Sequence, residues 1–221
     1  MLPLWDTEPH HRRPVITLLL IGACLAVFVK ELAVAAQGEA ALEAFVVRHG
    51  LVPARLLAGW RSAEEWGTVF SSMFLHGGWS HLLGNCWFLW VFGNNVECRL
   101  GHVRYLGLYA LTGVAAATAQ VLAGPGSEVP MVGASGAISG VLGAYLILCP
   151  RSWVVTLVPW VVPIIPVPAV VFLVLWFVLQ ALNGVGVLMG NADIEAGVAW
   201  WAHAGGFLAG ALLASRMRRR R

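Results

Sequence analysis

Long uncharged stretches separated by short charged ones dominate the pattern of hydrophobic and polar positions. An apolar run of about 18 residues is long enough for a helix to cross the ~30 Å hydrocarbon core of a bilayer. No Asp, Glu, Lys or Arg occurs in residues 66–96, 105–127, 129–150, 152–192 or 196–215, and a shorter apolar run, 14–29, precedes Lys30. The pattern predicts an all-α membrane protein with six spanning helices, at about residues 15–35, 79–97, 103–123, 135–149, 168–189 and 197–215.

The stretch 152–192 is long enough for two spans, but prolines at positions 159, 163, 166 and 168 interrupt its first half. Each proline removes a backbone donor and clashes with the preceding helical turn. We therefore expect residues 153–167 to form an interfacial or re-entrant piece, and only 168–189 to span.

The distribution of Lys and Arg favours six spans and sets their orientation, because cytoplasmic loops collect these residues. Both termini are predicted to be cytoplasmic, with an N-terminal segment 1–14, a membrane domain 15–215 and a basic tail 216–221. A cleavable signal peptide ending at Ala33-Val34-Ala35 is the alternative for the first span. With six spans, ten of the 14 basic residues share one side: Arg12, Arg13, Arg99, Arg104, Arg151, Arg216 and Arg218 to Arg221.

Composition excludes a soluble globular protein. The chain is 59% hydrophobic and only 11% charged, with a mean hydropathy of +0.77. Its net charge of +3 fits membrane topology and contact with the lipid bilayer rather than nucleic-acid binding.

The four cysteines include no C-x-x-C pair and no H-E-x-x-H occurs, so no metal or cofactor is expected. We expect a bacterial plasma membrane as the location, since no Ser-rich, acidic-poor transit peptide is present.

The long connection from about residue 37 to 78 mixes charged and apolar residues. It carries Trp60 and Trp66 and leads to Trp79, a composition that suits the membrane interface. We expect a structured first loop lying in the outer leaflet, and a merely solvated loop is the alternative.

Four polar residues fall inside the predicted spans at a similar depth. Counted at 1.5 Å per residue from the cytoplasmic arginine of each helix, Ser135 lies about 24 Å away, His203 about 20 Å, His81 about 27 Å and Asn85 about 21 Å. His81 and Asn85 are four positions apart and share a helical face. Polar groups in a bilayer are costly, so they are usually functional or mutually satisfied.

Small residues offer a way for these groups to meet, because they let helix backbones approach closely in lipid. Close approach of the fourth and sixth spans would bring Ser135 within hydrogen-bonding reach of His203. Packing without chemistry is the alternative explanation. The small residues are Gly133, Gly136 and Gly140 in or near the fourth span, and Ala202, Gly206 and Gly210 in the sixth.

Ser135 and His203 have the chemistry of a nucleophile and its base, since a neutral imidazole is the usual acceptor of a serine proton. Attack on a peptide bond creates an oxyanion, for which the Ser135 N–H, the Asn85 amide and the His81 ring are candidate donors. No carboxylate lies at this depth, so a Ser-His dyad is expected rather than a triad.

Three motifs, in this order, resemble those of bacterial six-helix rhomboid intramembrane serine proteases. They are H-x-x-x-N from His81 to Asn85, G-x-S-G from Gly133 to Gly136, and A-H-x-x-G-x-x-x-G from Ala202 to Gly210. The resemblance covers about residues 15–215. It implies a water-filled cavity open to the outer side, with Ser135 as nucleophile, His203 as general base, and His81 and Asn85 stabilising the oxyanion.

The same resemblance implies partners and an environment. Single-span membrane proteins are the expected substrates, cut within or beside their transmembrane segments, and a monomer is expected to suffice for catalysis. We expect lateral access between the second and fifth spans, which offer bulky apolar contacts at Trp87, Trp90, Phe172, Trp176 and Phe177. A catalytically inactive rhomboid-like protein that binds membrane helices is the alternative function, although retention of all four polar residues favours the enzyme.

Some positions depart from the family pattern. Many members carry an aromatic residue four positions after the nucleophile, where it stacks on the histidine; here Ser139 cannot stack, which leaves the support of His203 to another side chain. Asn94 replaces the aspartate of the usual G-D-N-V-E, far from the dyad. The Trp-Arg pair of some members is replaced around Trp66-Gly67-Thr68.

Overall fold

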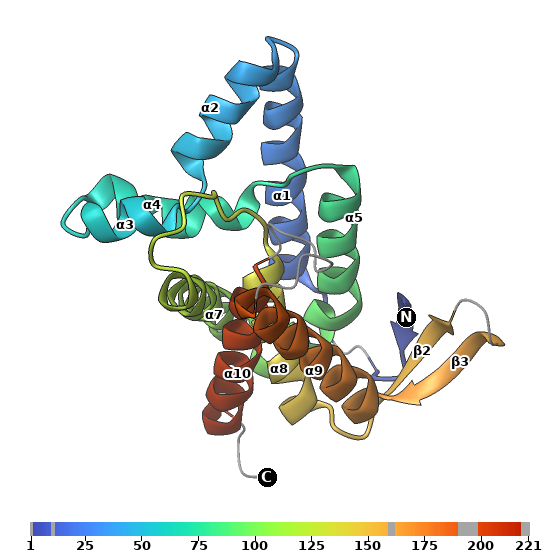
Figure 1. Cartoon of the computed structure of the whole chain (residues 1–221). Coiled ribbons are helices and arrows are strands. Elements are labelled where there is room, and N and C mark those ends of the chain that lie inside the picture. Colours follow the sequence, from blue (N-terminus) through green and yellow to red (C-terminus); the bar gives the residue numbers. More distant parts are fainter. Residues whose placement is uncertain (1, 10–11, 159–161, 190–198, 218–221) are drawn as a thin grey trace.

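A computed structural model describes residues 2–9, 12–158, 162–189 and 199–217, and within them the chain is mostly helical (Figure 1). Asp193, Glu195 and the basic tail from Arg218 to Arg221 lie outside these ranges. The helices are α1 (Val15–Ala35), α2 (Glu39–His49), α3 (Pro53–Ala58), α4 (Ala63–Ser71), the short η1 (Ser72–Phe74), α5 (Trp79–Phe88), the π-helical η2 (Leu89–Gly93), α6 (Asn94–Leu100), α7 (His102–Ala123), α8 (Ser135–Leu148), α9 (Ala169–Leu188) and α10 (Trp200–Met217), and the strands are β1 (Leu2–Asp6), β2 (Trp153–Val158) and β3 (Val162–Pro168).

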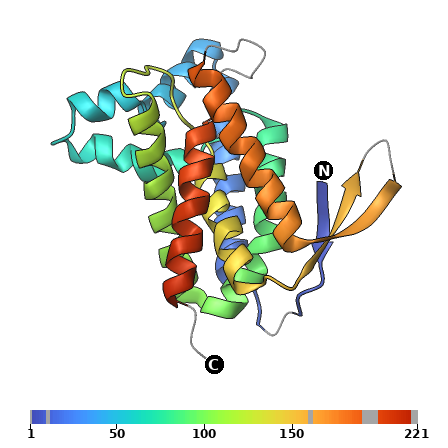
Figure 2. The ribbon, with the colours of Figure 1, turned by 60° about the horizontal axis from the view of Figure 1, so that its bottom comes forward.

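Each predicted span contains helix. By length and apolarity, three of the described helices could cross a membrane, namely α1, α7 and α9, and α8 is a shorter apolar helix. Figure 2 shows α7, α8, α9 and α10 side by side in one bundle. The count of six spans stays a prediction.

The second predicted span is a helical run through α5, η2 and α6 that changes pitch at Leu89–Gly93. Gly93 has no room for a side chain, since a Cβ there would lie 2.5 Å from the buried Tyr105 hydroxyl. One π-turn rotates the helical faces on either side of it relative to each other. The residues before the turn, including His81 and Asn85, therefore face a different direction from those in α6.

Glu97 in α6 ties this run to the start of α1. Pro14, at the N-cap of α1, gives no side-chain cap, so the first backbone N–H groups of that helix need acceptors from elsewhere. The buried Glu97 carboxylate accepts hydrogen bonds from the N–H groups of Ile16 and Thr17, each at 2.8 Å, and from the Thr17 hydroxyl at 2.7 Å.

Helices α8 and α10 touch through their backbones. A Cβ at Gly206 would overlap the backbone oxygen of Gly136, and a Cβ at Gly210 would overlap that of Gly140. Glycine at these positions lets the helix axes come close enough for main-chain contact. The spacing of the two helices is therefore set by backbone atoms rather than by side chains.

A small antiparallel sheet, in the order β1-β2-β3, stands out from one side of the bundle (Figures 1 and 2). The expectation of an all-α protein is wrong for these residues. No helix forms in residues 153–158 or 162–168, as the prolines indicate, and the Val, Ile and Thr residues there favour strands. Most of the prolines fall in the edge strand β3, where a missing N–H costs least.

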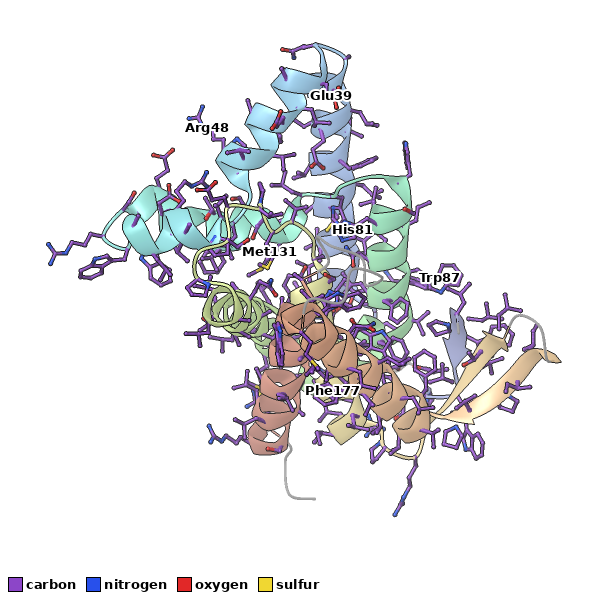
Figure 3. All side chains as sticks on the ribbon, in the orientation of Figure 1. Glu39, Arg48, His81, Trp87, Met131 and Phe177 are labelled. Carbon is purple, nitrogen blue, oxygen red and sulfur yellow. The ribbon has the colours of Figure 1, made fainter. Side chains whose placement is uncertain are left out.

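The N-terminal strand is fastened to the bundle by side chains. Asp6 accepts hydrogen bonds from the Asn95 amide at 2.5 Å and from the Tyr145 hydroxyl at 2.8 Å. The indole N–H of Trp87, which lies on the side of α5 nearest the sheet (Figure 3), donates to the Pro3 oxygen at 2.5 Å. The sheet is thus attached to α5, α6 and α8 through polar groups.

The connection between α1 and α5 is folded: α2 lies beside the end of α1, and α3 and α4 extend on the side away from the sheet (Figure 1). Arg55 holds it together, because its guanidinium reaches Glu65 at 2.7 Å, the Val47 oxygen at 2.5 Å and the Gly50 oxygen at 3.1 Å. A location in the outer leaflet stays a prediction.

Candidate active site

Ser135 and His203 share a hydrogen bond although 68 positions separate them in sequence, with 2.8 Å between the imidazole Nε2 and the serine Oγ. Ser135 is the first residue of α8, and His203 lies in the first turn of α10. Both side chains are half-buried. The backbone contact between Gly136 and Gly206, each within three residues of the pair, brings the two groups to this distance.

The turn before Ser135 requires glycine. Gly133 has a φ of +122°, in the region that side chains disfavour, and its N–H donates to the Ser72 oxygen at 2.9 Å. A Cβ at Gly133 would also lie 2.6 Å from the Nε2 of His81. The G-x-S-G motif therefore lets α8 begin at Ser135 with His81 packed against the turn.

Asn85 presents a buried amide donor next to this turn. Its side chain comes from α5 and is only 8% exposed, and no described atom accepts a hydrogen bond from its Nδ2. A Cβ placed on Gly133 would be 3.6 Å from that nitrogen. Buried polar groups are almost always paired, so this donor beside a serine is available to the oxygen of a ligand or of a water molecule.

His81 has its second ring nitrogen available for donation. Its Nδ1 accepts from the Gly77 N–H at 3.4 Å, so in the neutral ring the proton is on Nε2, the atom that faces Gly133. Neither His81 nor Asn85 forms a hydrogen bond with Ser135 in the described part of the chain. Both side chains come from α5 and lie beside the turn at Gly133, two residues before the serine.

Gln180 and Trp176 of α9 complete the surroundings of His203. The Oε1 of Gln180 lies 2.7 Å from the imidazole Nδ1, and the Trp176 ring centroid lies 6.0 Å from that of His203 at an interplanar angle of 39°. The Trp200 ring meets the imidazole edge-on at 6.1 Å. Aromatic contact thus reaches His203 from α9 and α10 rather than from position 139.

Sequence reasoning missed Gln180, although a signal was present. Gln180 and Asn183 are the polar side chains of an otherwise apolar α9, and Gln180 follows Trp176 by one helical turn. Ser139 instead donates its hydroxyl to the Ser135 backbone oxygen at 2.6 Å. Among the described residues, no group of three or more His, Cys, Asp or Glu side chains is placed to hold a metal ion.

Similarity to known proteins agrees with the motifs. The Rhomboid domain family matches residues 63–220. The chain is 33% identical to RHOMBOID-like protein 5 of Arabidopsis thaliana over 150 aligned residues. The aligned part is 68% of this chain and 43% of that protein. The chain is 39% identical over 82 residues to Rhomboid protease GluP of Bacillus subtilis, covering 37% of this chain and 16% of the relative.

A third relative, Rhomboid-like protease 5 of Toxoplasma gondii, is 36% identical over 97 residues, covering 42% of this chain and 11% of that protein. The chain therefore spans less than half the length of these curated relatives. The family match nevertheless takes in α4 to α10 and every residue of the site described above. This protein is a member of the rhomboid family and an integral membrane protein.

Proposed function

We propose that the chain is an intramembrane serine endopeptidase that uses Ser135 and His203 as a dyad. The observation that carries the proposal is the 2.8 Å hydrogen bond between His203 Nε2 and Ser135 Oγ. The names of relatives such as Rhomboid protease GluP support proteolysis at the level of the family.

In the first step, the neutral His203 accepts the Ser135 proton at Nε2 while Oγ attacks the carbonyl carbon of the substrate. A tetrahedral intermediate forms, with its negative charge on the former carbonyl oxygen. The His203 imidazolium then gives its proton to the leaving amine, and the peptide C–N bond breaks. Water, deprotonated by the same nitrogen, hydrolyses the acyl ester and restores Ser135.

The oxyanion needs donors that are in place before the reaction. The Asn85 Nδ2 suits this role because it is buried and has no acceptor among the described atoms. The His81 Nε2 and the Ser135 backbone N–H are the other two donors in the proposal. Placing an anion here would satisfy a buried amide that is otherwise unpaired.

Substrates in this proposal are single-span membrane proteins. An intact transmembrane helix shields its carbonyl oxygens through i to i−4 hydrogen bonds, so the segment has to unwind before attack.

We further propose six spans with both termini cytoplasmic, a bacterial plasma membrane, and lateral access between α5 and α9. Cross-linking α5 to α9 should then abolish cleavage of such a substrate, and unchanged turnover would reject that route.

The test of the proposed function is cleavage of a single-span substrate in liposomes by wild type, Ser135→Ala and His203→Ala. We expect only the wild type to cut, and a fluorophosphonate probe to label Ser135 only when His203 is present. Equal cleavage by wild type and Ser135→Ala would overturn the proposal. Inactive wild type that still retains the substrate would favour a protein that binds membrane helices.

A further inference from the structure

We propose that Gln180 is a positioning residue for His203, which holds the imidazole in the one neutral tautomer that can act as a base. Its effect on turnover rests on the function proposed above, whereas its effect on the imidazole does not. The juxtaposition that carries the inference is a short chain of groups, from Gln180 Oε1 to His203 Nδ1 at 2.7 Å and from His203 Nε2 to Ser135 Oγ at 2.8 Å.

The tautomer follows from the donors and acceptors in this chain. An amide oxygen only accepts, so the Nδ1 of His203 has to donate to Gln180. A neutral imidazole carries one ring proton, and placing it on Nδ1 leaves the lone pair on Nε2. That lone pair faces the Ser135 hydroxyl. In the other tautomer Nε2 would donate to the serine oxygen and could not accept its proton.

Gln180 occupies the place that an acidic residue takes in a Ser-His-Asp triad, but without the charge. An amide fixes the orientation and the tautomer of the ring, and it stabilises the imidazolium less than a carboxylate would. The Trp176 ring, whose centroid lies 6.0 Å from that of the imidazole, is close enough to attract the imidazolium that forms during the reaction. The two α9 residues thus divide between them the support that the family's aromatic residue at position 139 would have given.

The α9 helix is packed well enough against α10 to hold Gln180 in place. Phe177 stacks on Phe207 at 4.9 Å, and Trp176 lies 6.1 Å from the same ring. Phe207 is buried and follows His203 by one turn of α10. Aromatic contacts below the dyad therefore set the distance between Gln180 and the imidazole.

The kinetic test compares Gln180→Leu, which has similar size but no acceptor, with Gln180→Glu, which keeps an accepting oxygen. We expect Gln180→Leu to lower kcat about 10- to 100-fold with KM within about twofold, because ground-state binding does not involve the ring tautomer. Gln180→Glu should recover most of the turnover. The control is Asn183→Leu, the other polar position of α9, which makes no described hydrogen bond with the dyad and should retain wild-type kcat. Wild-type kcat in Gln180→Leu would overturn the proposal.

The structural test does not depend on proteolysis. Protein labelled with ¹⁵N-histidine reports ring protonation by NMR, and the His203 signal is identified by its loss in His203→Ala. We expect the Nδ1–H tautomer in wild type and a shift toward Nε2–H in Gln180→Leu. An Nε2–H tautomer in wild type, or the same tautomer in both proteins, would overturn the role of Gln180. If wild type shows Nδ1–H and Gln180→Leu shifts it while no substrate is cut, the proposed function fails and the positioning role stands.

Discussion

Gly206→Ala should separate α8 from α10 at the dyad. A Cβ at this position would overlap the Gly136 backbone oxygen and lie 3.4 Å from the Ala116 Cβ. The overlap is with main chain, which cannot swing away as a flexible side chain would. Relieving it requires α10 to move away from α8 by about 1 Å, a case of overpacking.

The cost of that movement has two parts. Overpacking a close contact destabilises by about 1–3 kcal/mol, and the better helix propensity of alanine offsets about 1 kcal/mol of it. The free energy of unfolding should therefore fall by up to about 2 kcal/mol. The effect on turnover is expected to be larger, because a misplacement of about 1 Å can cost roughly 100-fold in rate. His203, three residues before Gly206, would lose its 2.8 Å contact with Ser135.

Thermal unfolding in detergent and turnover of a single-span substrate in liposomes measure the two effects. The matched control is Gly22→Ala in α1, where a Cβ meets no atom within 4 Å. The same chemical change there should leave turnover intact and raise stability by up to about 1 kcal/mol. Wild-type turnover in Gly206→Ala would refute the reasoning that backbone contact between these helices sets the dyad distance.

Three further substitutions test other parts of the structure. Asn85→Ala should lower kcat about 100- to 1,000-fold, as loss of an oxyanion donor does. Thermal unfolding should show no loss of stability, because the buried Nδ2 has no described partner. A destabilised variant with normal kcat would contradict the role of Asn85 as a donor. Glu97→Ala should lower the free energy of unfolding by about 3 kcal/mol, since charge-assisted hydrogen bonds to the first turn of α1 and to the Thr17 hydroxyl are lost. An unchanged midpoint of thermal unfolding would count against this role of Glu97. Tyr145→Phe should cost about 1–2 kcal/mol through loss of its bonds to Asp6 and Ser152, with turnover unaffected; a normal denaturation midpoint would exclude that anchoring role.

The positions of the main helices were predictable because each coincides with a long stretch of sequence without charged residues. Counting from the arginines at the helix ends predicts a similar depth for Ser135 and His203, since helical rise is constant, and that depth stays a prediction. Their contact could be anticipated from the small residues at Gly136 and Gly206, which face each other in the structure. These inferences depend on local periodicity and on one contact between two regular elements.

The sheet could not be predicted in the same way, because its pairing depends on residues far apart. Leu2 pairs with Leu157, and Val154 with Val167, and a short N-terminal strand carries no periodic signal of its own. The prolines indicated where helix stops but not what replaces it. Gln180 was missed for a related reason, since its partner is fixed by the angle at which α9 packs on α10.

Backbone contact between α8 and α10 has a consequence for how freely this sequence can vary. Where side chains set the spacing of two helices, one substitution can compensate for another, so the residues at the interface can change. No residue is smaller than glycine, and any larger residue at Gly206 or Gly210 would meet the main chain of Gly136 or Gly140. A Cβ at Gly136 or Gly140 would instead overlap the Ala116 or Thr112 side chain of α7. Mutational tolerance should therefore be lowest along this seam and much higher on the outer faces of α1 and α9, a contrast that a saturation library selected for folding would reveal.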